Sequence, residues 1–76
     1  MTTTYRIVVT YKYRVQAFNR LDGVVQNTKE FLGPSFNMVY TTRSEADMAA
    51  FNLSMSGIPE VTYSTYPVRV PRRVGA

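Results

Sequence analysis

Residues 41–57 read TTRSEADMAAFNLSMSG, and this stretch is the one part of the chain that predicts a helix. Thr42 and Ser44 each precede an acidic residue by three positions, which is the spacing of a capping box, so either can begin the helix. Gly57 supplies a C-terminal stop because glycine readily adopts the backbone conformation that ends a helix. We therefore expect one helix within residues 41–57, with the rest of the chain folded around it.

At about 100° per residue, the apolar side chains of this helix fall on two faces. The alanine face consists of Ala46, Ala49, Ala50 and Leu53, and the Met/Phe face consists of Met48, Phe51 and Met55. A helix that packs on one sheet buries only one of these faces. If the alanines pack on the sheet, the exposed Met/Phe face is a candidate surface for a protein partner or for self-association. If the Met/Phe face packs on the sheet, the alanines face solvent, where their high helix propensity suits them. Both alternatives stay open.

Apolar and polar side chains alternate from Thr4 to Phe18, which predicts a strand with one buried and one solvated side. The apolar side carries Tyr5, Ile7, Val9, Tyr11, Tyr13, Val15 and Ala17, and the polar side carries Arg6, Lys12 and Arg14. At about 3.3 Å per residue such a run spans roughly 50 Å, which is long for a small domain. We expect the strand to bend, to carry a bulge or to end near Tyr13.

Between this strand and the helix, Asp22-Gly23 predicts a hairpin turn. Residues 24–32 then predict a second, weaker strand, and residues 36–40 a short segment that is extended or leads into the helix. The sheet is therefore expected to continue up to the helix.

After the helix, residues 61–70 predict a closing strand. Pro67 lies inside it and cannot donate to a ladder, so we expect an edge strand or a bulge there. Residues 71–76 are expected to form a basic C-terminal tail. Together these segments predict one α+β domain over residues 1–76, with a three- or four-stranded, mainly antiparallel sheet and one helix on one face.

The composition argues against an enzyme or a metal protein. The 76 residues include no cysteine and no histidine, which are the commonest nucleophile, base and metal-ligand residues in such sites. The glycines are isolated and form no phosphate-binding loop. No apolar run approaches the roughly 18 residues of a membrane span. We therefore expect a cytoplasmic, non-catalytic protein without cofactor, metal or membrane segment.

The net charge of +4 is unevenly distributed, because all acidic residues lie in the middle of the chain. The basic residues near the ends are Arg6, Lys12 and Arg14, and then Arg69, Arg72 and Arg73. These six side chains are candidates for a positive surface that follows phosphates or an acidic protein. The alternative is a solvated sheet face whose charges discourage pairing between edges. On the first strand the tyrosines lie opposite the cations, whereas base stacking requires both on one side.

In size and composition the chain resembles the small accessory proteins with which phages and mobile elements block host machinery, anti-CRISPR proteins among them. We therefore predict a non-enzymatic protein that occupies a surface on a partner. The predicted partner is a protein or protein–nucleic-acid complex that handles nucleic acid. Two alternatives stay open: direct, sequence-independent binding to DNA or RNA, and a small structural subunit of a larger particle.

Overall fold

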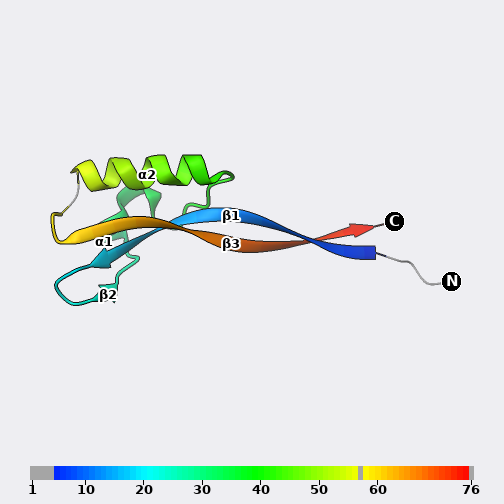
Figure 1. Cartoon of the computed structure of the whole chain (residues 1–76), viewed down its shortest axis with the longest axis horizontal. Coiled ribbons are helices and arrows are strands. Elements are labelled where there is room, and N and C mark those ends of the chain that lie inside the picture. Colours follow the sequence, from blue (N-terminus) through cyan, green and yellow to red (C-terminus); the bar gives the residue numbers. More distant parts are fainter. Residues whose placement is uncertain (1–4, 57, 76) are drawn as a thin grey trace.

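The computed structural model describes residues 5–56 and 58–75 and has the predicted α+β architecture (Figure 1). The elements follow the order β1 (Tyr5–Asn19), β2 (Val24–Val25), α1 (Lys29–Leu32), the 3-10 helix η1 (Gly33–Ser35), α2 (Arg43–Ser56) and β3 (Val61–Gly75). The sheet has the strand order β2-β1-β3, and both neighbouring pairs are antiparallel. Helix α2 packs on one face of this sheet. No helix in the described part of the chain is long and apolar enough to cross a membrane.

Of the three alternatives expected for the long first strand, the early end and the bulge do not occur, and the strand continues with a twist. Its 15 residues pair with the 15 residues of β3 in one unbroken register, from Tyr5 opposite Gly75 to Asn19 opposite Val61. The two strands twist around each other and extend well beyond the end of α2 (Figure 1). A two-stranded ribbon twists more freely than a wide sheet, which accommodates the length. The molecule is accordingly elongated, with extents of 60 × 23 × 15 Å.

Strand β3 is an edge strand, as Pro67 predicted, but it has no bulge. Pro67 lies opposite Tyr13, whose backbone N–H and C=O bond to Tyr40 on the other side. The Tyr13–Pro67 pair therefore makes no ladder bonds, and the missing proline donor would point to the free edge. Pro71 lies opposite Val9, four residues away in the same phase. Because its second proline also fits the ladder, β3 continues through Gly75, which corrects the predicted tail. Ala76 lies outside the described residues.

The predicted strand over residues 24–32 is correct only for Val24–Val25. The next two residues still bond to Ala17, through the Gln26 N–H to its C=O and the Asn27 side chain to its N–H, both at 2.8 Å. The chain then leaves the sheet and forms α1. One helical turn brings Leu32 under the sheet, where it is only 2% exposed, which a continued edge strand would not do.

The predicted extended segment over residues 36–40 is also shorter than expected. Only Tyr40 pairs with the sheet, through a single bridge to Tyr13. The preceding residues form turns, and Asn37 has a φ of 65°, a left-handed conformation that asparagine tolerates. Their apolar side chains, including Met38 at 47% exposed, do not enter the core.

Helix α2 starts where one of the two capping boxes predicts. The Glu45 N–H donates to Thr42 Oγ1 at 3.3 Å, so Thr42 and not Ser44 caps the helix. The alanine face packs on the sheet, with Ala46 fully buried and Ala50 8% exposed. The burial of the alanines decides between the two alternatives for the helix. Side chains this small let the helix approach the sheet closely. The predicted stop at Gly57 lies outside the described residues.

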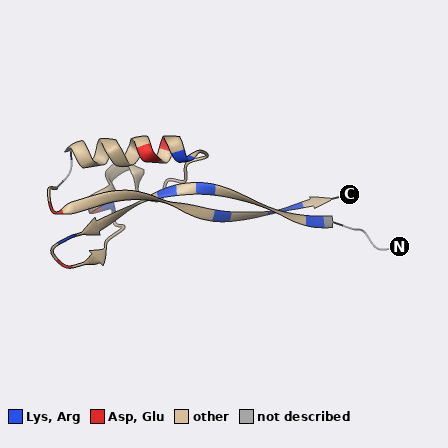
Figure 2. Ribbon diagram, viewed as in Figure 1, with Lys and Arg blue, Asp and Glu red and all other residues tan. Residues whose placement is uncertain are grey.

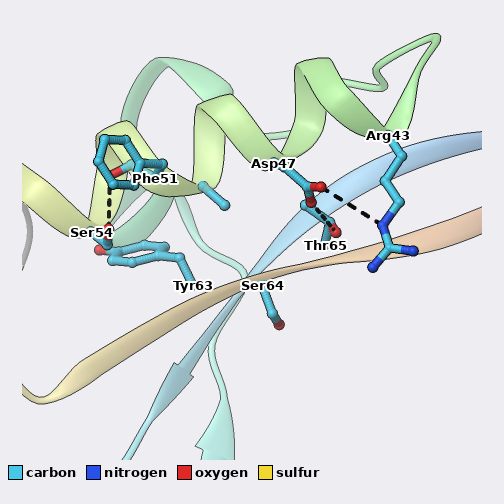
Figure 3. Close-up of a pocket in the computed structure, with 8 residues that line it drawn as sticks. Arg43, Asp47, Phe51, Ser54, Tyr63, Ser64 and Thr65 are labelled. Carbon is cyan, nitrogen blue, oxygen red and sulfur yellow. Dashed lines mark hydrogen bonds and ion pairs between the residues drawn. The ribbon is translucent and has the colours of Figure 1, made fainter.

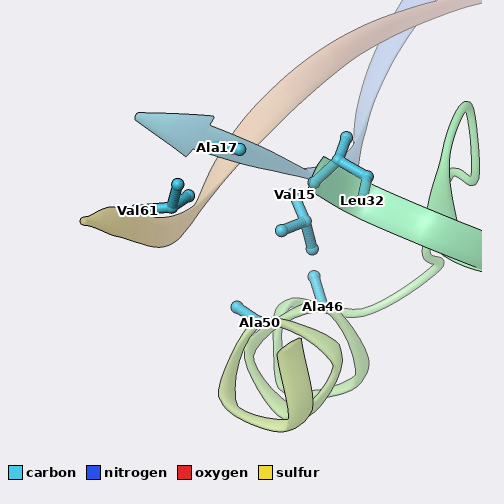
Figure 4. Packing of buried hydrophobic residues seen from close by; sticks show 6 residues of the cluster. All are labelled: Val15, Ala17, Leu32, Ala46, Ala50 and Val61. Carbon is cyan, nitrogen blue, oxygen red and sulfur yellow. The ribbon is translucent and has the colours of Figure 1, made fainter. Parts of the chain in front are cut away.

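The buried core lies between α2, α1 and the inner half of the sheet (Figure 4). Its six residues are Val15, Ala17, Leu32, Ala46, Ala50 and Val61. Figure 4 shows these side chains converging from both strands and both helices. The sheet residues among them, Val15, Ala17 and Val61, lie in the half of the sheet beneath α2, so the core stabilises one end of the molecule and leaves the other end uncovered.

Candidate functional site

The outer half of the β1–β3 pair forms an arm that projects beyond α2 (Figure 1). We define the cationic arm as residues 5–12 of β1 with residues 68–75 of β3, paired from Tyr5–Gly75 to Lys12–Val68. Strand β2 pairs only with Phe18 and Asn19, far from this region. None of the arm side chains that the structure describes is buried. The arm is therefore a ribbon two strands wide with both faces open to solvent.

The arm carries positive charges only. Its charged residues are Arg6, Lys12, Arg69, Arg72 and Arg73, and Arg14 lies at its base. The acidic residues of the chain lie elsewhere, at Asp22, Glu30, Glu45, Asp47 and Glu60. Figure 2 shows the basic positions along the projecting ribbon and the acidic ones on α2 and the loops. The two ends of the chain, which are separately basic in sequence, thus form one positively charged element.

The six cations do not form one flat surface. Residues opposite each other in an antiparallel pair project to the same side, and successive residues project to opposite sides. Arg72 lies opposite Val8 and therefore shares a face with the β1 cations Arg6, Lys12 and Arg14. Arg69 and Arg73 lie opposite Tyr11 and Ile7 and project from the other face. Each face of the arm thus presents cations.

Arg14 lies at the base of the arm, and the body of the protein holds it. Its Nη2 donates to Asn37 Oδ1 at 3.1 Å, and its side chain is half-buried. It shares a face with Arg6 and Lys12, as the alternation predicts, while those two side chains are exposed. The predicted group of three thus comprises two exposed arm cations and one anchored cation at the base.

Strand pairing also brings an aromatic side chain to cations that the sequence alone does not connect. Tyr11 is 53% exposed and lies directly opposite Arg69. Ile7, which is 63% exposed, lies opposite Arg73 on the same face. Within β1 the tyrosines and cations occupy opposite sides, so periodicity indicates that they are separate. Only the register with β3 places Tyr11 beside Arg69, and no local signal in the sequence predicts that register.

The Met/Phe face is a second exposed surface, on the body rather than on the arm. Met48, Phe51 and Met55 of α2 are 65%, 61% and 73% exposed, and Phe51 lies on the flank of α2 that meets β3. The face is therefore separate from the cationic arm and is a candidate surface for another protein.

A shallow, open groove of about 440 Å³ lies where one flank of α2 meets β3 (Figure 3). Asp47 is engaged on both sides, accepting a 2.8 Å hydrogen bond from Thr65 Oγ1 and lying 3.7 Å from Arg43 Nε. The Ser54 hydroxyl donates to its own helix, to the Phe51 carbonyl at 2.7 Å. Figure 3 shows Ser64 pointing away from the helix. The Thr65–Asp47 hydrogen bond attaches α2 to β3, the other two contacts lie within α2, and we assign the groove a structural role.

Tyr63 lies at the inner end of this groove and connects the sheet to α1. Its hydroxyl donates to the Phe31 carbonyl at 3.0 Å. Partial burial raises the pKa of the Tyr63 phenol because the charged form would lose solvation. The neutral, hydrogen-bonded phenol is thus the form that the fold stabilises.

No protein-family model, characterised protein or solved structure shows significant similarity to this chain. The features of the molecule that bear on function are therefore the charge and shape of the arm and the exposed helix face.

Proposed function

We propose that this protein is a non-catalytic nucleic-acid-binding protein and that the cationic arm is its binding element. One observation carries the proposal: five cations and no acidic residue lie on a ribbon two strands wide that projects from the body. The body carries four basic and five acidic residues and is therefore nearly neutral, so the arm accounts for the net charge of +4. A protein of this polarity meets a polyanion with its arm first.

The arm has the side chains that phosphate contacts require. Arginine and lysine neutralise phosphates and release condensed counterions, which supplies most of the affinity in sequence-independent binding. Alternate residues on a strand project to the same side about 6–7 Å apart, so several arm cations reach one run of backbone together. The exposed Tyr11 beside Arg69 adds a ring that can contact sugar or base.

Salt dependence tests this proposal. We expect the protein to bind a fluorescein-labelled 20-base-pair DNA duplex, with log K falling by about 0.9 for each phosphate contact as log salt rises. If all five arm cations contact phosphates, the slope of that plot approaches about −4.5. An affinity independent of salt, or no binding at 50 mM salt, would contradict the proposal.

A charge-matched control separates the arm from net charge. The variant Arg69→Gln/Arg72→Gln removes two arm cations, and Lys29→Gln/Arg43→Gln removes two cations from the body. If the arm binds, only the first variant makes the salt slope less negative, by about 1.8. Equal losses in both variants would mean that overall charge, and not the arm, attracts the duplex.

A second candidate function is favoured by the exposure of the Met/Phe face. In this function the protein occupies a surface on another protein, in particular one that handles nucleic acid, and the arm adds contacts to the nucleic acid. The exposed side chains are large and adaptable, which suits a protein interface. We expect Phe51→Ser to abolish binding to such a partner while DNA binding persists. The converse result, loss through Arg69→Gln/Arg72→Gln alone, would assign binding to the arm.

A further inference from the structure

The proposed function leaves open how the arm meets its ligand, and the distribution of cations over both faces of the ribbon bears on this. We infer that the arm enters the major groove of B-form duplex DNA, so that cations on its two faces reach the two phosphate walls. This inference rests on the proposed function and narrows it to one ligand and one geometry. The observation that supports it is the face of the arm from which each cation projects, which the β1–β3 register determines.

A flat array of phosphates can be contacted by only one face of a ribbon. On the arm, Arg6, Lys12 and Arg72 project from one face and Arg69 and Arg73 from the other. A ribbon lying flat on a backbone would turn two of its five cations away from the ligand. A groove has phosphates on both sides of whatever lies inside it. Cations on both faces are therefore matched by a groove and not by a flat surface.

The width of the arm selects the groove. Two neighbouring strands lie about 4.8 Å apart, and side chains on both faces add to that width. The major groove of B-form DNA is about 12 Å wide and 8.5 Å deep and admits a two-stranded ribbon. The minor groove, about 6 Å wide, is too narrow for a ribbon with arginines on both faces. The major groove of an A-form RNA duplex is deep and narrow and excludes it as well.

The length of the arm sets the footprint. Eight paired residues extend about 26 Å at roughly 3.3 Å per residue. One turn of the duplex is about 34 Å long, so the arm occupies less than a turn. The body cannot follow the arm into the groove, because α2, α1 and β2 make the molecule wider on the body side of the Tyr13–Tyr40 bridge (Figure 1). The base of the arm, with the anchored Arg14, then lies at the rim of the groove beside phosphates.

Two face-specific variants test the inference against flat binding. Arg6→Gln/Arg72→Gln removes two cations from one face, and Arg69→Gln/Arg73→Gln removes two from the other. In groove binding both variants weaken binding, and each makes the salt slope less negative by about 1.8. The body variant Lys29→Gln/Arg43→Gln leaves the slope unchanged. A loss confined to one face variant would overturn groove binding and leave the proposed function standing.

A second experiment uses the unaltered protein, so it does not depend on how any variant folds. Binding is measured on a DNA duplex, on the same duplex with bulky substituents at the 5-positions of its pyrimidines, on an RNA duplex and on single-stranded DNA. The 5-position lies in the major groove, so we expect the substituted duplex to bind at least about tenfold more weakly. The RNA duplex and single strand are also expected to bind more weakly than the unmodified duplex. Equal binding to any of the three would overturn the inference, while no binding to any nucleic acid would overturn the proposed function itself.

Discussion

Tyr13 and Tyr40 exchange two backbone hydrogen bonds, of 2.9 Å from the Tyr13 N–H and 2.7 Å from the Tyr40 N–H. Among the described residues, this bridge is the outermost backbone pairing on the β2 side of β1. Toward the tip of the arm from this bridge, β1 pairs along its backbone with β3 alone among the described residues. The bridge therefore marks the boundary between a body with a buried core and an arm without one.

This boundary predicts a step in local stability along β1. An isolated two-stranded ribbon is marginally stable in water, whereas body strands open only with the core. Thr10 and Gln16 belong to the set of alternate β1 residues whose backbone groups face β3, one in the arm and one in the body. We expect the Thr10 amide to exchange with solvent at least about tenfold faster than the Gln16 amide in an NMR hydrogen-exchange experiment. Equal protection would show that the arm and body open together.

The opposite burial of Leu32 and Phe51 predicts very different costs of truncation. Leu32 is 2% exposed and Phe51 is 61% exposed. Leu32→Ala is expected to lower the free energy of unfolding by about 2–5 kcal/mol, because it leaves a cavity in a small core. Phe51→Ala is expected to change it by no more than about 0.5 kcal/mol. Urea unfolding of both variants measures the difference, and a cost above about 2 kcal/mol for Phe51→Ala would place that ring in the core.

Local pattern in the sequence predicts the helix, the long strand and the class of fold. The strand around Val15 and Ala17 can be predicted from the period-two alternation of apolar and polar residues alone. The helix at Arg43–Ser56 can be predicted from its capping residues and the spacing of its apolar residues. Local pattern does not predict Leu32 in a helical turn. Residues 24–32 are polar enough for a solvated strand, whereas in the structure the helical turn places Leu32 in the core with Val15.

The candidate site depends on pairing over long sequence distances, which is why it was predicted only in part. The sequence shows that the two ends of the chain, which contain Arg6 and Arg72, are basic and carry no acidic residue. That these ends pair in register is a property of the sheet, and a shift of one residue would exchange the faces of every β3 side chain. The neighbours Tyr11 and Arg69, and the division of the cations over two faces, follow from that register alone.

The hydrogen bond from Tyr63 to Phe31 predicts a pH-dependent stability. Burial raises the pKa of Tyr63 above its ordinary value of 10.0, so the folded state holds this proton more tightly than the unfolded state does. The stabilisation is complete below pH 10 and is lost as the pH rises above it, because the unfolded chain then loses the proton first. Tyr63→Phe has no such proton, so its stability falls less steeply with rising pH.

At pH 8 the Tyr63→Phe variant is expected to be less stable than the wild type by about 0.5–1.5 kcal/mol, because the Phe31 carbonyl loses its donor. Between pH 8 and pH 11 this difference should become smaller. Urea unfolding of both proteins at the two pH values measures it. A difference that stays constant or grows would mean that Tyr63 ionises equally easily in the folded and unfolded chains.

The two prolines of β3 predict how the free edge of the arm is kept from pairing. Pro67 and Pro71 lie at positions whose backbone groups point away from β1, so each removes a donor from the exposed edge. An edge without these prolines offers a continuous row of donors and acceptors to another strand. We expect Pro67→Thr/Pro71→Thr to self-associate as its concentration rises, because threonine favours strands and restores both donors. Pro34→Thr, in η1, is the matched control and should behave as the wild type does. Sedimentation velocity between 10 and 500 µM, at about 150 mM salt so that repulsion between the arms is screened, measures the association. If the double variant sediments like the wild type throughout this range, the charges of the arm and not its prolines protect the edge.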